Sequence, residues 1–174
     1  MINTFSDTTK KYYLDGKVVE NNFANDLIAS EGGFIVAPSK TDDIKNHIDL
    51  FWVKNDKSCS FDVKGVRKKS RYDTSVSYDT TWLELKNVNG LNGSLLGKQD
   101  YMAFEMKDEW VIVRRKSLLL SLLKMLSDKT IYNTNPNEDY KLYQRSGRQD
   151  LIVRVPYSFI IANSVKKISK NIWF

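Results

Sequence analysis

Residues 58–69, SCSFDVKGVRKK, hold an acid and a lysine two positions apart at the end of an apolar run. Because side chains alternate in an extended chain, Asp62 and Lys64 project to one side, and Phe61 and Val63 project to the other. The apolar pair is suited to a core, while the acid and the lysine lie just before a basic run. The stretch therefore predicts a strand that places reactive side chains at an edge of the fold.

A second acid, Asp49, precedes this strand in the run HIDLFWVK. The letters NDKS separate that run from CSFDVKGV, which is a hairpin signal. Antiparallel pairing about this turn brings Asp49 and Asp62 side by side. Two carboxylates can share Mg²⁺, which takes oxygen ligands and keeps several waters. Lys64 beside them can polarise a phosphate, stabilise developing charge, or help to orient and deprotonate an attacking water.

These residues resemble the motif of the PD-(D/E)XK nuclease superfamily, which includes restriction enzymes, Holliday junction resolvases and many phage nucleases. In that motif an early acid is followed on the next strand by an acid, any residue and a lysine, here HIDLFW and FDVKG. Glu20 stands where similar members carry a glutamate on the first helix. The resemblance covers roughly residues 17–127, with WLELKNVNG, GKQDYMAFE and WVIVRRKSLL as later strands and a closing helix.

The resemblance implies a restriction-endonuclease-like α/β fold, with a mixed central β-sheet flanked by α-helices, in a single domain over residues 1–174. It implies Mg²⁺-dependent cleavage of DNA, with Mn²⁺ able to substitute, and action on branched DNA as in resolvases. Asp49 and Asp62 would hold the metal, Glu20 would complete or orient the site, and Lys64 would serve the attacking water and the scissile phosphate. Resolvases also suggest a homodimer, and phage members suggest DNA recombination in an infected host.

Some of these residues have simpler interpretations. Glu84 and Lys86 in LELK repeat the acid–lysine spacing, but Asp73 and Asp79 upstream lie in a turn-rich loop, so we favour FDVK as the active strand. Lys86 then forms a cross-strand ion pair or contacts a phosphate. Glu20 also fits a solvated position in the first turn of a helix. His47, two positions before Asp49 on the same strand face, is interpreted as a surface residue or as an aid to the site.

The charge balance favours a polyanionic partner. Lys and Arg number 27 against 21 Asp and Glu, which gives a net charge of +6 and a pI near 9.2. DNA therefore leads a membrane surface as the expected partner. Trp82, Tyr72 and Tyr78 can stack on unpaired bases, although core packing is the more usual role of tryptophan. The expected DNA-binding residues are Arg67, Lys68, Lys69, Arg71, Lys86 and Lys98.

The rare residue types exclude other classes of site. Cys59 is the only cysteine, which rules out an internal disulfide and a multi-cysteine zinc site and fits a reducing compartment. His47 is the only histidine, and no nucleophile-elbow pattern accompanies it, so hydrolase triads are disfavoured. The N-terminus has no signal-peptide core, and no run approaches the roughly 18 apolar residues of a membrane span. We expect a soluble cytoplasmic protein without membrane contact.

Hydrophobic periodicity predicts the elements that position these residues. We expect a helix over residues 17–31, a strand at FIVAPS, a polar loop at KTDDIKN and a strand at TWLELKNV. A second hairpin, YMAFEM with EWVIVRRK, precedes an apolar helix, SLLLSLLKML, for which Ser117 is the expected cap. The tail, residues 138–174, is expected to add a strand pair and a closing helix from YSFIIANS onward. Leu118–Leu126 and the terminal residues Ile172, Trp173 and Phe174 are the expected dimer contacts.

Two other function classes stay open. The first is a catalytically inactive nucleic-acid-binding or anti-defence module on the same fold, which intact Asp49, Asp62 and Lys64 argue against. The second is a protein-binding structural domain in which the acid–lysine strand carries surface ion pairs only. Weak, salt-insensitive DNA binding would favour that second class.

Overall fold

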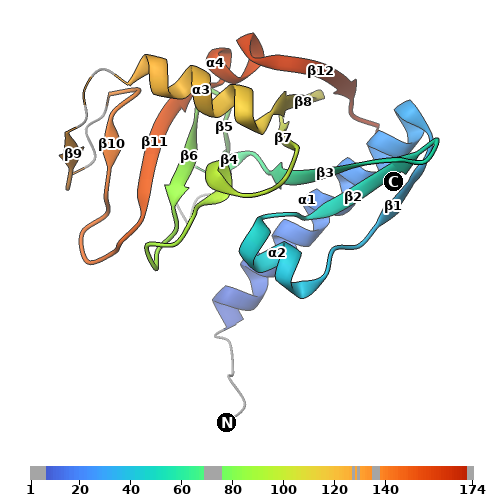
Figure 1. The fold of residues 1–174 in the computed structure, drawn as a ribbon, viewed down its shortest axis with the longest axis horizontal. Coiled ribbons are helices and arrows are strands. Elements are labelled where there is room, and N and C mark those ends of the chain that lie inside the picture. Colours follow the sequence, from blue (N-terminus) through green and yellow to red (C-terminus); the bar gives the residue numbers. More distant parts are fainter. Residues whose placement is uncertain (1–6, 69–75, 127, 129, 135–137, 172–174) are drawn as a thin grey trace.

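The computed structural model describes residues 7–68, 76–126, 128, 130–134 and 138–171. Figure 1 shows their arrangement, with α1 behind the strands β2 and β3 and with β6, β11, β10 and β9 together at the opposite side. A six-stranded sheet has the order β1-β2-β3-β7-β8-β12, a four-stranded sheet has the order β6-β11-β10-β9, and β4 pairs with β5. The fold is mixed α/β, as expected. However, its strands divide between two main sheets instead of forming one central sheet.

The elements follow one another along the chain with short connections. The helices are α1 (Asp7–Glu31), α2 (Lys40–Asn46), the 3₁₀ turn η1 (Ser94–Leu96), α3 (Arg115–Met125) and α4 (Tyr157–Ala162). The strands are β1 (Phe34–Val36), β2 (Leu50–Lys54), β3 (Lys57–Lys64), β4 (Arg67–Lys68), β5 (Val76–Ser77), β6 (Thr80–Lys86), β7 (Tyr101–Glu105), β8 (Glu109–Arg114), β9 (Ile131–Tyr132), β10 (Leu142–Tyr143), β11 (Leu151–Pro156) and β12 (Ser164–Ser169).

The predicted hairpin around NDKS is confirmed. β2 and β3 pair antiparallel with Leu50 opposite Phe61. Asn55 and Asp56 between them both have positive φ, 50° and 58°. A two-residue turn of this handedness matches the twist of paired strands, and Asn and Asp tolerate it. β7 then runs parallel to β3 on its other side, which makes the six-stranded sheet mixed.

Helix α1 covers one face of the six-stranded sheet. Phe23 and Leu27 are buried against Phe61 and Val63 of β3 and against Trp110 of β8. The expected helix over residues 17–31 is confirmed at its C-terminal end, and it begins earlier, at Asp7. The alternation of β3 therefore works as predicted, because its apolar side chains pack under α1 and its acid and lysine face away from this helix.

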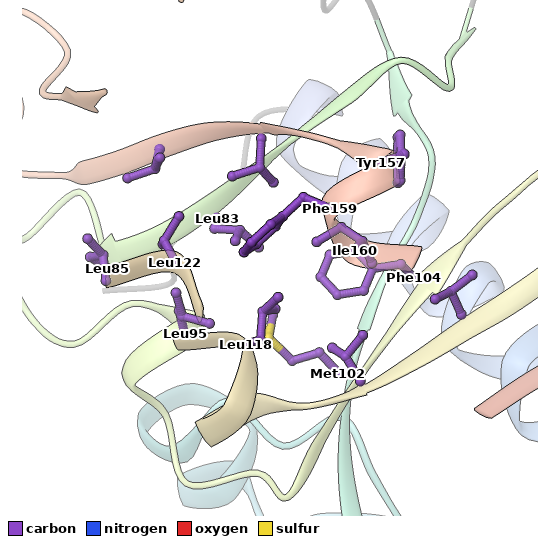
Figure 2. Packing of buried hydrophobic residues seen from close by; sticks show 14 of the residues in the cluster. Leu83, Leu85, Leu95, Met102, Phe104, Leu118, Leu122, Tyr157, Phe159 and Ile160 are labelled. Atoms are coloured by element: carbon purple, nitrogen blue, oxygen red, sulfur yellow. The ribbon is translucent and has the colours of Figure 1, made fainter. Parts of the chain in front are cut away.

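The other face of the six-stranded sheet packs on the second sheet. Met102 and Phe104 of β7 meet Leu83 of β6, Val153 of β11 and Leu118 of α3 in one buried cluster. Figure 2 shows these side chains converging with those of α4. This core contains residues from β6, β7, β11 and α4. The C-terminal tail therefore contributes to the main hydrophobic core.

Helix α2 corrects the expected polar loop at KTDDIKN. Ser39 caps it, since its hydroxyl accepts a hydrogen bond from the Asp42 amide at 3.1 Å. The acids Asp42 and Asp43 lie in the first turn, where their negative charges stabilise the helix by interacting with the positive end of its dipole. His47 ends α2 with a left-handed φ of 56°, so it is not on a strand beside Asp49. Its ring lies 2.8 Å from the Asn92 carbonyl oxygen.

The expected closing helix is wrong beyond residue 162. α4 ends at Ala162, and Asn163 turns the chain into β12, which pairs antiparallel with β8. The strand is favoured because Ile168 becomes buried in the core under α1, while Lys166 and Lys167 stay outside. The terminal residues Ile172, Trp173 and Phe174 lie outside the described residues.

Helix α3 begins two residues before the expected cap. Its N-cap is Arg114 and not Ser117. Leu118 and Leu122 are buried, while Leu120 and Leu123 are 60% and 52% exposed, so only one face of this apolar helix packs on the sheets. The homodimer stays a prediction. No helix in the described part of the chain has the length and apolar character that crossing a membrane requires.

Candidate active site

The acid–lysine pair lies at the C-terminal end of β3. The ammonium of Lys64 donates to Asp62 Oδ1 at 2.7 Å. Asp62 is 3% exposed, whereas about a third of the Lys64 side chain remains open to solvent. The strand thus holds the carboxylate inside the fold and places the cation at the surface.

Asp49 lies immediately before β2 and is tied to the same strand. Its amide donates to the Phe61 carbonyl at 2.8 Å, and its Oδ2 accepts from the Val63 amide at 2.6 Å. Burial and then the negative charge of Asp62 raise the pKa of Asp49 to about 7, against the opposing effects of the Val63 amide and Lys64. The two acids therefore lie close enough to repel each other, as the hairpin predicted.

Glu20 reaches the same region from α1. Lys17, one turn earlier, donates to Glu20 Oε2 at 2.6 Å, and the Lys17 ammonium lies 3.9 Å from Asp43 of α2. Partial burial raises the pKa of Glu20, and the charges of Asp43 and Asp62 add to that rise, although Lys17 opposes it. The charge of Glu20 also acts on Asp49. Glu20 is thus within electrostatic reach of Asp49 and Asp62, although these three acids do not form a group close enough to hold one metal ion together.

Lys64 is held in its charged form. Burial alone would lower its pKa, but the charge and hydrogen bond of Asp62, followed by the charges of Asp49 and Glu84, outweigh burial and raise it. A lysine with a raised pKa is a cation at neutral pH. This favours the stabilisation of negative charge on a phosphate over the abstraction of a proton from water.

One oxygen of the site has no hydrogen-bond partner among the described residues. Asp62 Oδ2 is buried and accepts no hydrogen bond from this part of the chain, although Oδ1 is paired with Lys64. A buried carboxylate oxygen without a donor is costly unless a cation or water satisfies it. The described residues contain no group of three or more His, Cys, Asp or Glu side chains close enough to hold a metal ion. Of these described residues, only the two carboxylates Asp62 and Asp49 are left as oxygen donors, and such a set suits a hard cation that keeps most of its waters, such as Mg²⁺.

The predicted DNA-binding residues lie in different places. Lys86 ends β6 and is exposed. Lys98 is also exposed and lines a hollow of about 480 Å³ with Arg114 and Lys116, near the start of β3 and so at the opposite end of that strand from Lys64. Arg67 and Lys68 form β4, three to four residues after Lys64. Lys69 and Arg71 lie outside the described residues, as do Tyr72 and Asp73.

Several residues near the site were not predicted. Lys17 could have been found from its i, i+3 spacing to Glu20, which pairs opposite charges on one helix face. Tyr143 and Arg145 come close to Lys64 only through the packing of the second sheet, and no local pattern signals this. Trp82 was expected in the core, but it is partly exposed and belongs to neither buried cluster.

Comparison of the chain with protein-family models, curated proteins and solved structures found no match. The assignment of a function therefore depends on the side chains of the site and on their surroundings.

Proposed function

We propose that this protein is a Mg²⁺-dependent DNA endonuclease with a restriction-endonuclease-like fold, acting on branched DNA in the manner of resolvases. The observation that supports this most directly is the grouping of Asp49, Asp62 and Lys64 at one end of β3, with Asp62 Oδ2 buried and without a hydrogen-bond donor among the described residues. A mixed sheet with α1 across one face is compatible with that fold.

Asp49 and Asp62 would hold the cation, and Glu20 would orient it or complete its shell through water. When bound, Mg²⁺ would supply Lewis-acid activation of a phosphodiester and of a water molecule. The raised pKa of Asp49 supports a cation at this place, because a nearby positive charge would relieve the repulsion between the two carboxylates.

Lys64 contributes a fixed positive charge. Its ammonium is directed by Asp62 Oδ1, and about a third of its side chain is open to solvent, so a non-bridging oxygen of the scissile phosphate would be able to accept a hydrogen bond from it. Such a charge is most effective where negative charge increases in the transition state. Asp62 therefore has two roles on two oxygens, since Oδ1 orients Lys64 and Oδ2 is left for the cation.

The direct test is incubation of the protein with plasmid and with branched DNA in Mg²⁺, in Mn²⁺, in Ca²⁺ and in chelator. We expect cleavage only with Mg²⁺ or Mn²⁺, and DNA binding in all four conditions, because phosphate contacts come largely from basic side chains. Binding without cleavage in every condition would instead identify an inactive nucleic-acid-binding module.

A further inference from the structure

A hollow of about 390 Å³ lies directly beside Lys64, between the end of β3 and the second sheet. This volume is within the usual range of small-ligand sites. Its lining includes Lys64, Trp82, Glu84, Tyr143, Arg145 and Ile152.

Three neighbouring strands supply the wall of this hollow. Ile152 of β11 pairs with Glu84 of β6 on one side and with Tyr143 of β10 on the other, so these three side chains share one face of the sheet. Trp82 lies two residues before Glu84 and therefore on the same face. Leu83 points to the opposite face, into the main core.

Two aromatic rings form a corner of the hollow. The ring centroids of Trp82 and Tyr143 are 5.9 Å apart, and the ring planes meet at 41°. Both side chains are partly exposed, and Ile152 beneath them is buried. A flat aromatic ligand can therefore stack on one ring and meet the edge of the other, an arrangement that aromatic groups favour.

Polar groups flank this corner. The carboxylate of Glu84 can accept hydrogen bonds, and it lines the hollow near Lys64, on which its charge acts. Arg145 is fixed by hydrogen bonds to Asp150, which is 0% exposed, yet a third of the Arg145 side chain remains accessible. Its remaining N–H groups are therefore donors with a set direction.

We propose that this hollow binds an unpaired nucleobase of DNA next to the phosphate that Lys64 contacts. Stacking surfaces suit the face of a base, and Glu84 and Arg145 suit the donors and acceptors on its edge. The inference rests on the proposed function, because Lys64 must contact a phosphate for the neighbouring base to enter. It predicts substrates with unpaired nucleotides, such as overhangs, flaps and junctions, over blunt duplex.

The first test uses the wild-type protein in Ca²⁺ and three fluorescent probes read by anisotropy. One probe is a blunt duplex, the second carries a single-stranded extension, and the third carries the same extension with abasic sugars. We expect the second probe to bind roughly 5- to 150-fold more tightly than the third, since stacking of one base contributes that much. Equal affinity for the second and third probes would overturn the proposal.

The second test removes the rings. The double variant Trp82→Leu with Tyr143→Leu should lose the difference between the second and third probes while keeping the wild-type affinity for blunt duplex. Tyr143→Phe, which keeps the ring, should retain the difference. The matched control is Phe34→Leu, because Phe34 is 57% exposed on β1 and does not line this hollow. An undiminished difference in the double variant would also overturn the proposal.

The two proposals fail separately. Cleavage of DNA in Mg²⁺ with no effect of the abasic sugars would uphold the nuclease and reject the base site. A clear effect of the abasic sugars without cleavage of any DNA would uphold the base site and reject the nuclease.

Discussion

Asp62 uses its two oxygens differently, and this difference distinguishes the site from a surface ion pair. An exposed pair has both oxygens in water and contributes little. Here Oδ1 is bound to Lys64 at 2.7 Å, and Oδ2 is buried without a donor from the part of the chain that the structure describes. Leaving a carboxylate oxygen in that state costs folding free energy, which is typical of groups kept for function.

Substitution of the acid–lysine pair should abolish cleavage. Lys64→Ala and Asp62→Asn each remove a charge that acts on the transition state, an effect of about 3 to 4 kcal/mol, so the rate should fall by roughly a hundredfold or more. DNA affinity should change little, but the melting temperature should fall in both variants, because each leaves one member of a largely buried ion pair without its partner, so cleavage is compared well below both melting temperatures. Lys86→Ala is the matched control, with at most about 1 kcal/mol at stake for an exposed lysine. A fully active Lys64→Ala beside an inactive Lys86→Ala would move the site to β6.

Asp49 should make the metal-free protein less stable as pH rises. Its pKa of about 7 in the fold exceeds the value near 3.9 of an unfolded chain. The folded state therefore holds the proton more tightly, and the stability associated with it is lost as pH rises from about 4 to about 7. Asp49→Asn keeps the acceptor for the Val63 amide but removes the charge. In chelator the variant should melt at least about 2 °C higher than wild type near pH 8, and no higher near pH 4.

The control for Asp49 is Asp108→Asn, at an exposed turn position. It should not change the melting temperature at either pH. An Asp49→Asn variant that melts below wild type near pH 8 would show that the repulsion between the two acids is not the dominant effect.

Sequence alone predicted much of the site, because its key relations are local. Asp62 and Lys64 are related by strand alternation, and Asp49 is related to them by a two-residue hairpin turn. The oxygen of Asp62 that lacks a donor among the described residues could not be predicted, because its burial depends on the long-range packing of β3 with β7 and the second sheet. Trp82 was misassigned to the core, since alternation shows which residues share a face but not which face the core will take.

At the scale of elements, α1 carries Glu20, and its position depends on a buried acid. Asp26 is 1% exposed and accepts hydrogen bonds from Trp110 Nε1 at 2.7 Å and from the backbone and side-chain amides of Asn171 at 3.0 Å. These bonds join α1 to β8 and to the segment after β12. The C-terminal tail therefore helps to hold the helix that delivers Glu20.

Asp26→Ala should destabilise the protein by about 1 to 3 kcal/mol, because it leaves the buried Trp110 N–H without an acceptor. The melting temperature should fall by roughly 2 to 12 °C. The matched control on the same helix is Glu31→Ala, which removes a half-exposed ion pair with Lys166 and should cost at most about 1 kcal/mol. Equal losses in the two variants would show that the Asp26 hydrogen bonds do not anchor α1.

Element prediction failed where a short or non-local interaction decides the outcome. Helix α2 has seven residues and no buried side chain, so hydrophobic periodicity could not reveal it, and only the Ser39 cap signals its start. β12 is a strand because β8 offers it an open edge, which is a long-range relation. Likewise, β6 overlaps its predicted span, although it begins at Thr80 and ends at Lys86, but its partner β11 lies more than sixty residues later in the chain.

At the scale of the whole molecule, the second sheet lies beside the end of β3, where its side chains line one hollow together with Lys64. One face of the second sheet packs on Met102 and Phe104 of β7. The opposite face of the second sheet carries Trp82 and Tyr143, which line the hollow beside Lys64. One sheet thus supplies the charged groups and the other supplies the aromatic surface. The net charge of +6 then favours a nucleic acid at their junction.

The salt dependence of DNA binding should show which basic residues contact the phosphates. The basic run of Arg67, Lys68 and Lys69 begins three residues after Lys64. A triple alanine variant should therefore bind DNA more weakly in Ca²⁺. It should also reduce the slope of log K against log salt by up to about 3, nearly one unit for each phosphate contact. The control triple is Lys124, Lys166 and Lys167, which removes the same charge from α3 and from β12. Because β7 and β8 separate β12 from β3, the control should keep the wild-type slope. If both triples reduced the slope equally, DNA binding would reflect net charge alone, and the basic run after Lys64 would have no special place in the interface.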